Sequence, residues 1–261
     1  MSSVLEKPKM FYWSDQRIKW YDDAVKLSNY HNMVIDEISP YIDKTNTVFD
    51  VACGLGYISE RISPLVKNVY SFDYDKNAIN SLNSRCKNID NIECVFGDWH
   101  ESLKGKKCDV SILSYCNGII EYFDFLKNIT NNYLIGIHLL KNKVHNFGVN
   151  KHTDIGKTFN RRETSETIMT FLDENKIPYE LKKIECEFGQ PFKEKSEAGD
   201  FIKEYFKITD KPKIDEIIET NLIKKDDYYY LPNTKKSGII IIDIKKLKEG
   251  NCLIWKAMKN I

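Results

Sequence analysis

The sequence predicts a doubly wound α/β domain with a mostly parallel seven-stranded sheet, an N-terminal helical cap and a helical insertion before the last strand. Three observations lead to this prediction. Short apolar strands alternate with amphipathic helices from residue 47 to residue 187. A glycine-containing turn follows the first strand, at Gly54 and Gly56. Two amphipathic helices then interrupt the alternation before a final apolar run at residues 238–242.

The first half of the chain follows the strand, loop and helix pattern closely. Two helices are expected between residues 17 and 42, because apolar residues recur there at helical spacing. The first strand is expected at residues 47–51, and the next helix begins near Tyr57 and ends at Pro64. Further strands are expected at residues 69–73, 92–96, 110–114 and 133–140, with helices at residues 77–86 and 122–129. Right-handed crossovers between such strands give a parallel sheet with helices on both faces.

The second half continues with a helix at residues 163–175 and a strand at residues 180–187. The alternation breaks at Gly189-Gln190-Pro191, and two helices with a single apolar face follow. We expect these helices to form a mobile lid over the carboxyl edge of the sheet, within residues 187–233. One structural domain is expected, with a cap at residues 1–46, an α/β core at 47–192, the inserted lid at 193–236, and the last strand and C-terminal tail at 237–261.

The composition argues against several classes of function and does not exclude a nucleic-acid substrate. The chain of 261 residues has 39 basic and 38 acidic side chains, so it lacks the basic excess of a dedicated nucleic-acid-binding protein. Its apolar runs have the length of strands, and the first residues carry no signal-peptide-like stretch, so we expect a cytoplasmic protein without a membrane partner. Its seven cysteines include no C-x-x-C pair, and we expect reduced thiols and no metal site.

The strand and turn at residues 48–56 read Val-Phe-Asp-Val-Ala-Cys-Gly-Leu-Gly and carry the strongest functional signal. Glycine permits positive φ and a close approach of the backbone to a ligand, at a helix N-terminus that favours a carboxylate. The second strand ends in Asp73, where a carboxylate can accept hydrogen bonds from both hydroxyls of a ribose. We expect Asp75 to cap the helix that follows. A glycine turn alone also occurs as a structural bend.

Two further segments make the pattern specific. Gly97-Asp98-Trp99 follows the third strand, and Cys108-Asp109-Val110-Ser111-Ile112-Leu113 forms the fourth. Together with the glycine turn and Asp73, these segments resemble the ordered motifs of class I S-adenosylmethionine-dependent methyltransferases, over about residues 47–117. The resemblance implies a Rossmann-like methyltransferase fold, S-adenosylmethionine as cofactor, and a methyl transfer that produces S-adenosylhomocysteine. The cofactor-binding residues that it implies are Asp50, Ala52, Gly54, Gly56, Asp73, Tyr74, Asp98, Trp99 and Ser114.

The resemblance also assigns roles to these residues. The Asp50 position contacts the methionine end of the cofactor, Asp73 holds the ribose, and Asp98 binds the adenine amino group beside Trp99. The sequence departs from the family at Ala52, where a glycine is common, and this bears on the geometry of the turn. A nicotinamide-dependent dehydrogenase can share the glycine turn and Asp73, but the third motif and the late insertion fit that class poorly.

The acceptor is expected beside the loop after the fourth strand, because ligands of open α/β sheets bind beyond the carboxyl ends of the strands. Tyr115 and Asn117 in this loop are catalytic candidates, and His138 in the fifth strand is a third, although a strand histidine is more often part of the core. The loop lacks the Asn/Asp-Pro-Pro-Tyr/Phe type of motif found in amino-methylating nucleic-acid enzymes. Cys116 lacks the preceding proline of cytosine-C5 enzymes, so we do not expect covalent catalysis.

Other side chains are candidates for contacts with the acceptor. The polar stretch at residues 141–162 contains His145, His152, Asp154, Arg161 and Arg162, and the arginine pair is suited to an anionic acceptor or to ion pairs with Glu163 or Glu166. Rings that can face the acceptor or the sulfonium belong to Tyr12, Trp13, Tyr228, Tyr229 and Tyr230, and packing is the simpler role for each. Tyr30 and His31 can reach the pocket from the N-terminal cap, and a surface helix position is the simpler role for His31.

The prediction is therefore an enzyme that transfers a methyl group to an N, O, S or C atom of a small-molecule acceptor, with no nucleic-acid partner. Two alternatives stay open. An aminopropyl-type transferase would use the same fold with a related donor, and a catalytically silent protein would bind S-adenosylmethionine as an interaction module. The sequence leaves open the acceptor, the use of a general base, the pathway and the oligomeric state.

Overall fold

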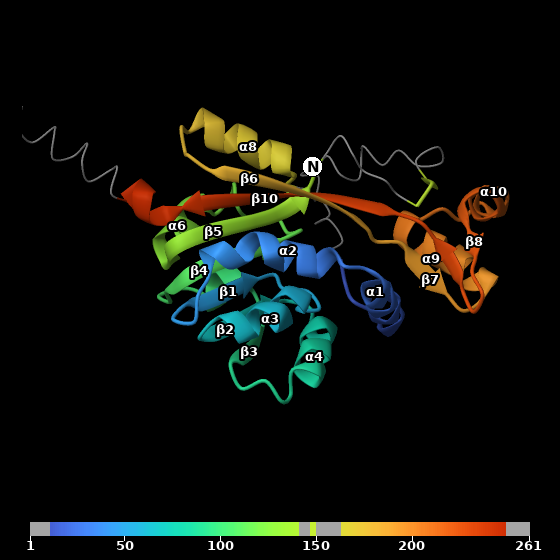
Figure 1. The fold of residues 1–261 in the computed structure, drawn as a ribbon, viewed down its shortest axis with the longest axis horizontal. Helices are drawn as coiled ribbons and strands as arrows, with labels where there is room; N and C mark the ends of the chain where they lie inside the picture. Colours follow the sequence, from blue (N-terminus) through green and yellow to red (C-terminus); the bar gives the residue numbers. More distant parts are fainter. Residues whose placement is uncertain (1–10, 141–146, 150–162, 249–261) are drawn as a thin grey trace, which may run out of the picture.

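The computed structural model describes residues 11–140, 147–149 and 163–248 (Figure 1). Its centre is a seven-stranded sheet with the order β3-β2-β1-β4-β5-β10-β6. The strands are β1 (Thr47–Val51), β2 (Asn68–Asp73), β3 (Ile92–Phe96), β4 (Cys108–Ser114), β5 (Thr130–Leu139), β6 (Glu180–Glu187) and β10 (Thr234–Asp243). The first five strands of the sequence pair in parallel, whereas β10 is antiparallel to both β5 and β6. This topology confirms the predicted doubly wound, mostly parallel sheet.

Helices cover both faces of the sheet, because alternate residues of each strand point to opposite sides. The helices before the insertion are α1 (Asp15–Leu27), α2 (Tyr30–Ile38), α3 (Tyr57–Ile62), α4 (Lys76–Arg85), α5 (Trp99–Ser102), α6 (Phe123–Ile129) and α8 (Ser165–Glu174), with 3-10 turns at Ser39–Tyr41 and Ser63–Leu65. Neighbouring residues of β10 show the division, since Ile239 packs in the cluster that contains α2 and Ile240 in the cluster that contains α6 and α8.

The start of the fifth strand differs from the sequence prediction. This strand begins at Thr130 instead of residue 133, beside the start of the fourth strand at Cys108. The buried Cys108 thiol, Ser111 hydroxyl and Thr130 hydroxyl contact one another at the start of these strands. Polar residues at these positions obscured the apolar pattern on which the prediction depended, although they satisfy one another inside the sheet.

The insertion contains the two expected helices, α9 (Lys195–Phe206) and α10 (Lys211–Asn221), and also a small sheet that was not predicted. Its strands are β7 (Gln190–Phe192), β8 (Ile223–Lys224) and β9 (Tyr229–Leu231), in the order β7-β9-β8. The segment at which the predicted alternation breaks thus leads directly into a paired strand. Gly189 lies so close to Tyr230 that an added Cβ would be 2.3 Å from the phenol oxygen.

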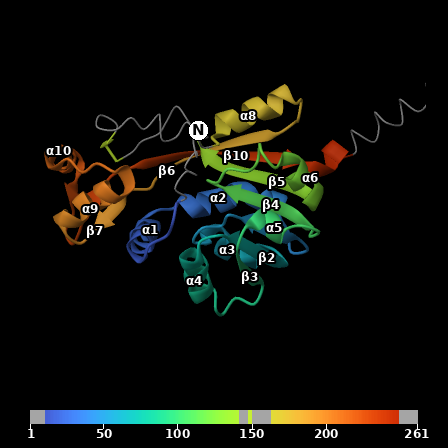
Figure 2. The ribbon, with the colours of Figure 1, turned by 180° about the vertical axis from the view of Figure 1, so that it is seen from behind.

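The insertion packs on α1, and both ribbon views show α1 beside β7 and α9 (Figures 1 and 2). Trp20 of α1 is buried in the apolar cluster of the insertion and stacks edge-on against Phe201, with ring centroids 5.3 Å apart. The Gln190 side-chain amide donates a hydrogen bond to the Trp20 carbonyl at 2.9 Å. Arg17 forms an ion pair with Glu204 at 2.7 Å. Through these contacts the cap and the insertion share one core.

The carboxyl end of β5 points toward the side of the molecule that carries α1 and the insertion (Figure 1). The parallel strands beside it end on the same edge of the sheet. The ends of β1, β2 and β4 therefore bring the predicted motifs together at one edge. Among the helices that the structure describes, none has the length and apolar character needed to cross a membrane.

Candidate active site

The turn between β1 and α3 has the left-handed backbone that the glycine motif implies. Its φ values are 55° at Ala52, 54° at Gly54 and 70° at Gly56. A Cβ on Gly56 would lie 2.4 Å from a Leu82 methyl carbon, so only glycine fits there. Ala52 adopts a positive φ despite its Cβ, at a cost of about 1–2 kcal/mol. The departure from the family pattern at Ala52 thus leaves the turn formed but strained.

Asp50 supplies a buried carboxyl next to this turn. One oxygen accepts a hydrogen bond from the Ser59 hydroxyl, which in turn accepts one from Ser71 at 2.7 Å. The other oxygen, Oδ1, has no hydrogen-bond partner among the residues described. Burial raises the pKa of Asp50 to about 7, and the Asp73 charge adds to this shift. A buried acceptor without a partner is suited to a ligand cation such as an ammonium group.

Asp73 ties the first two strand ends together. Its Oδ2 accepts a hydrogen bond from the Gly54 amide at 2.7 Å, and its Oδ1 accepts one from the Asp75 amide at 2.8 Å. Burial raises its pKa. Each carboxylate oxygen can accept a further bond, so these contacts leave room for ribose hydroxyls. Asp75 caps α4 as predicted, by accepting hydrogen bonds from the amides of Asn77 and Ala78.

The segment before α1 lies across the glycine turn. The Trp13 amide donates a hydrogen bond to Asp75, and the Asn77 side-chain amide donates one to the Trp13 carbonyl at 2.8 Å. The Trp13 indole nitrogen lies 3.6 Å from the place where a Cβ of Gly54 would be. The Tyr74 hydroxyl, a predicted cofactor contact, donates a hydrogen bond to the Phe11 carbonyl. Trp13 thereby covers the turn where the motif is predicted to bind its ligand.

The predicted adenine contacts lie at the next strand end. Asp98 is exposed and caps α5, accepting a hydrogen bond from the Glu101 amide at 3.2 Å. Trp99 lies against Gly118 in the loop after β4, where an added Cβ would be 3.1 Å from its ring. It also packs edge-on against Tyr122, with centroids 5.2 Å apart. Trp99 therefore bridges the ends of β3 and β4. Asp98 beside it is exposed and thus accessible to a ligand.

Tyr115 follows Ser114, the last residue of β4, and adopts a φ of 54°. Its hydroxyl forms hydrogen bonds with the Tyr30 hydroxyl and the Ser237 hydroxyl, and the last two are 3.1 Å apart. Burial raises the pKa of Tyr115 well above that of a free phenol. The predicted catalytic phenol therefore belongs to a three-hydroxyl network that joins α2, β4 and β10.

An aromatic cluster surrounds this network; its rings belong to Tyr21, Tyr30, His31, Tyr57, Tyr115 and Phe188. His31 is buried in this cluster, and burial lowers its pKa to about 2. Tyr21 connects the cluster to the glycine turn, since its ring centroid lies 5.4 Å from that of Trp13. The cluster is therefore continuous with the predicted cofactor site.

Lys235 of β10 extends its ammonium group into the aromatic cluster. Its Nζ lies 4.1 Å from the ring centroids of both Tyr30 and Tyr115, and 4.9 Å from that of Phe188. Burial lowers its pKa to about 7. Lys235 was not predicted, because it stands next to another lysine after the insertion, and only the pairing of β10 with β5 and β6 brings it beside the end of β4. The sequence offers one indication of its position: Lys235 stands two residues before Ser237 and therefore points to the same face of the strand.

The other two catalytic candidates, Asn117 and His138, make their contacts outside the hydroxyl network of Tyr115. Asn117 is exposed and accepts a hydrogen bond from the Glu163 amide at 2.8 Å, while the Glu163 carboxylate accepts from the amides of Ile119 and Ile120. His138 lies opposite Gly238 on the face of the sheet that α8 covers, away from the face that carries Tyr115. Burial lowers the pKa of His138 to about 4. The structure therefore does not bring His138 and Tyr115 together.

Three sets of predicted residues remain, namely Cys116, Tyr230 and the residues outside the described part of the chain. Burial raises the pKa of the Cys116 thiol, which does not favour a nucleophilic thiolate. Tyr230 of β9 connects the insertion to β6, because its hydroxyl donates a hydrogen bond to the Glu187 carboxylate at 2.8 Å. The C-terminal tail beyond residue 248 and the side chains of His145, His152, Asp154, Arg161 and Arg162 lie outside the described residues.

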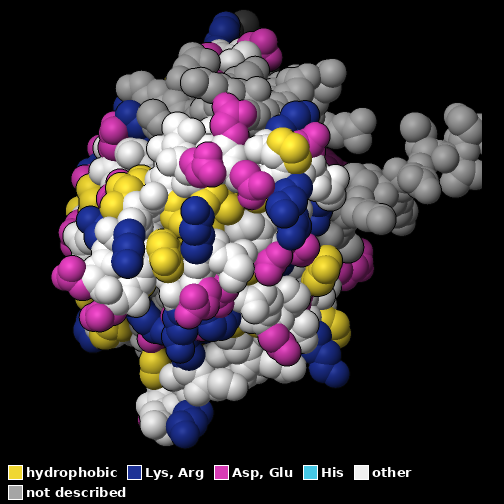
Figure 3. Space-filling view, turned by 90° about the vertical axis from the view of Figure 1, so that its right-hand side faces the viewer, with side chains coloured by type: hydrophobic (Ala, Val, Ile, Leu, Met, Phe, Trp, Pro, Cys, Tyr) yellow, Lys and Arg dark blue, Asp and Glu magenta, His cyan; other side chains and the backbone are white. Residues whose placement is uncertain are grey.

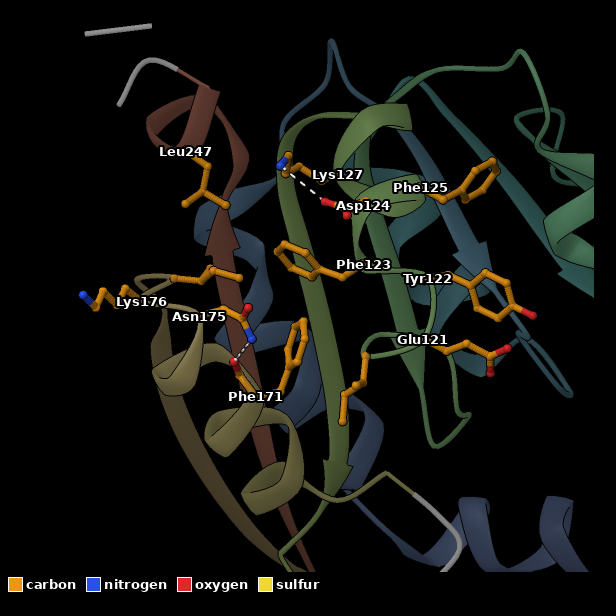
Figure 4. Close-up of a pocket in the computed structure, with 12 residues that line it drawn as sticks. Glu121, Tyr122, Phe123, Asp124, Phe125, Lys127, Phe171, Asn175, Lys176 and Leu247 are labelled. Atoms are coloured by element: carbon orange, nitrogen blue, oxygen red, sulfur yellow. Dashed lines mark hydrogen bonds and ion pairs between the residues drawn. The ribbon is translucent and has the colours of Figure 1, made fainter. Parts of the chain in front are cut away.

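A separate groove of about 520 Å³ lies between α6 and the end of α8, near Leu247 (Figure 4). Phe123, Phe171 and Lys176 are among its lining residues, and none of the predicted cofactor residues lines it. It is therefore distinct from the glycine turn. On the side of the molecule that carries the insertion, acidic and basic side chains are interspersed without a patch of one sign (Figure 3).

Comparison with solved structures places this arrangement in a known fold. A precorrin 8W decarboxylase from Methanobacterium thermoautotrophicum is 14% identical, covers 82% of this chain and 89% of its own, and superposes with a TM-score of 0.50. The YcgJ protein from Bacillus subtilis is 16% identical, covers 80% and 97%, and has a TM-score of 0.50. A putative methyltransferase from Bacillus halodurans is 14% identical, covers 85% and 99%, and has a TM-score of 0.49. No family model matches the sequence. The chain has the Rossmann-like fold of class I S-adenosylmethionine-dependent methyltransferases, as its sequence motifs predicted.

Proposed function

We propose that this protein is an S-adenosylmethionine-dependent methyltransferase that acts on a small-molecule acceptor. The observation that carries the proposal is the group of polar atoms at the carboxyl edge of the sheet. Asp50 Oδ1 has no partner among the described residues, beside a turn of left-handed residues that leads into the N-terminus of α3. These features suit the ammonium and carboxylate of an amino acid, and Asp73 on the neighbouring strand suits a ribose.

S-adenosylmethionine supplies an activated methyl group on a sulfonium. The residues of the chain then have to bind, align and exclude water, and alignment alone can contribute about 7–11 kcal/mol in favourable cases. Trp13 covers the turn, and Trp20, which belongs to α1, packs in the apolar cluster of the insertion. Such a covered edge favours a small acceptor, and the near balance of 39 basic and 38 acidic residues also supports it. We also propose that the protein is soluble and located in the cytoplasm.

Calorimetry with S-adenosylmethionine, S-adenosylhomocysteine and NAD tests the cofactor assignment. We expect both adenosyl ligands to bind with dissociation constants in the micromolar range and NAD not to bind. Decarboxylated S-adenosylmethionine is the matched probe for an aminopropyl-type transferase, because it lacks the carboxylate that the glycine turn would hold. Preference for this probe would replace the methyltransferase proposal with that alternative, and NAD binding would contradict both.

A further inference from the structure

Lys235 is a partly buried amine with no acidic partner among the described residues, in contrast to the lysine beside it. Lys236 forms an ion pair with Glu185 at 2.6 Å on the other face of β10. Lys235 lies opposite Cys186 of β6, and among the described residues its ammonium group contacts only aromatic rings. Aromatic faces stabilise a cation less than a carboxylate does, so much of the cost of burying the charge remains.

Four titratable groups of the described residues face Lys235, and they come from α2, the loop after β4, and β6. Burial raises the pKa of Tyr30 in α2 to about 12, and it also raises the pKa of Tyr115 after β4 well above that of a free phenol. His31 of α2 has a pKa of about 2, lowered by burial and by the Lys235 charge. Cys186 of β6 is the fourth group, and Phe188 adds an apolar ring. Lys235 is therefore the group of this cluster that can exchange a proton at neutral pH.

We propose that Lys235 is the proton acceptor of the methyl-transfer reaction, for a neutral acceptor that carries a proton on its nucleophilic atom and lies against the Tyr30 and Tyr115 rings. The proposal rests on the methyltransferase function given above. Tyr115 directly follows β4, where the acceptor of an open α/β sheet is expected. The aromatic cluster connects Lys235 to the glycine turn through Tyr21 and Trp13. This placement, rather than burial alone, selects Lys235.

The step conserves atoms and charge. The lone pair of the acceptor forms a bond to the methyl carbon, the carbon–sulfur bond breaks with its electron pair on sulfur, and the acceptor proton passes to Lys235 Nζ. One positive charge is present before and after, first on the sulfonium and then on the lysine. Two positive charges in one poorly solvated site repel each other, so the bound sulfonium favours the neutral amine that can take the proton.

This repulsion can be measured without knowing the acceptor. The affinity ratio of S-adenosylmethionine to S-adenosylhomocysteine, obtained by calorimetry between pH 6 and pH 8.5, isolates the effect of the sulfonium charge, since both ligands share the amino acid and the nucleoside. We expect this ratio to rise about fivefold with pH in the natural protein, as Lys235 loses its proton. In Lys235→Met the rise should disappear, apart from the part contributed by Asp50, and in Lys236→Met it should persist.

Two further measurements complete the test. Lys235→Arg keeps the positive charge at every pH, so its ratio should stay about fivefold below that of the natural protein at pH 8.5. In protein with ¹³C-labelled lysine, the Cε signal that Lys235→Met removes should titrate near pH 7, and at least half a pH unit lower with S-adenosylmethionine bound but not with S-adenosylhomocysteine. Melting curves establish that each variant is folded.

The outcomes separate the two proposals. Failure of both adenosyl ligands to bind the natural protein overturns the methyltransferase function, and the role of Lys235 with it. Binding of both ligands, with a pH-dependent ratio that Lys235→Met leaves unchanged, overturns the role of Lys235 alone. A Lys235 signal that titrates near pH 10 in the free protein has the same consequence.

Discussion

At the scale of single residues, the predicted cofactor contact Asp50 also affects stability. Its pKa of about 7 lies above that of an aspartate in an unfolded chain, about 4, because burial disfavours the charged form. The folded protein therefore holds this proton more tightly, and the stability associated with it is present below pH 4 and is lost as the pH rises through 7. Acting alone, the shift corresponds to a loss of about 4 kcal/mol over this range.

We predict that Asp50→Asn removes this loss while weakening cofactor binding. The amide oxygen of asparagine can still accept the Ser59 hydrogen bond, but the side chain carries no charge at any pH. The free energy of unfolding, from urea titrations at pH 5 and pH 8, should fall less with pH in the variant than in the natural protein, by about 2 kcal/mol or more. Calorimetry should show at least a tenfold weaker affinity for S-adenosylmethionine. Parallel stability curves would mean that Asp50 is charged in the free protein.

For Asp73 we predict at least a tenfold loss of S-adenosylmethionine affinity on substitution by alanine, which is about 1.4 kcal/mol. The side chain also holds the Gly54 and Asp75 amides, so the substitution removes two internal hydrogen bonds. Asp73→Asn is the matched control, because it keeps one acceptor oxygen and nearly the same volume. An unchanged affinity in a folded Asp73→Ala variant would remove this residue from the ribose role.

Asp98→Ala should cause a smaller loss than Asp73→Ala. An adenine amino group makes one contact where a ribose offers two hydroxyls, and the exposed Asp98 is partly engaged in capping α5. Calorimetric titrations of the two variants under one set of conditions give the comparison. If the loss at Asp98 exceeds that at Asp73, the assignment of the two strand ends to adenine and ribose is wrong.

At the scale of elements, the insertion and α1 share one apolar cluster, so we predict that they open together. Trp20→Ala removes the ring that α1 contributes to this cluster. Hydrogen exchange should then become faster throughout residues 190–231 as well as in α1. Phe171→Ala on α8 is the matched control, since that aromatic packs in a different cluster, and it should leave exchange in the insertion unchanged. Faster exchange confined to α1 would show that the insertion is stable by itself.

That residues 187–233 form a mobile lid stays a prediction, and it concerns the same unit of insertion and α1. In the free protein, exchange in residues 187–233 should be faster than in the central strands, and it should slow down when S-adenosylhomocysteine binds. The contacts with α1 add a requirement, namely that α1 slows down with the insertion. Exchange that is as slow as in β1 and β4, and unaffected by the ligand, would make the insertion fixed scaffold.

The large elements were predictable because their patterns are local. A buried parallel strand reads as an apolar run and an amphipathic helix as a 3.6-residue period, and both are visible in the sequence around Asp50 and Asp73. The small sheet of the insertion has strands of two or three residues, which are too short for a period to appear. Their pairing joins Gln190 to Leu231 across two helices, a contact of long sequence separation that no local pattern reports.

At the scale of the whole molecule, the predicted cofactor motifs come together at one sheet edge because each follows a parallel strand. The acceptor side was harder to predict for the opposite reason. Tyr30, Tyr115 and Ser237 belong to three elements far apart in the chain, and their hydrogen bonds form only once β10 pairs beside β5. His138 shows the same limit, since its position in β5 was predicted, but the face to which it points depends on strand register.

The charge of the whole molecule leads to a last prediction, which separates a small acceptor from a nucleic acid. Affinity for nucleic acid comes largely from basic side chains that displace counterions from phosphates, and it falls steeply as the salt concentration rises. This chain has a formal net charge of +1 at pH 7, and acidic and basic groups are mixed on the face in Figure 3. We therefore expect a fluorescently labelled RNA hairpin to bind with a dissociation constant above about 100 µM at 150 mM salt, near the weak limit of non-specific binding. Fluorescence anisotropy at 50 mM and 200 mM salt measures both affinity and salt dependence, and saturating S-adenosylhomocysteine in a parallel titration shows whether the cofactor changes either. Low-micromolar binding that weakens by two or more orders of magnitude between these concentrations would replace the small-molecule acceptor with a nucleic acid, and the search for the acceptor would then begin with RNA.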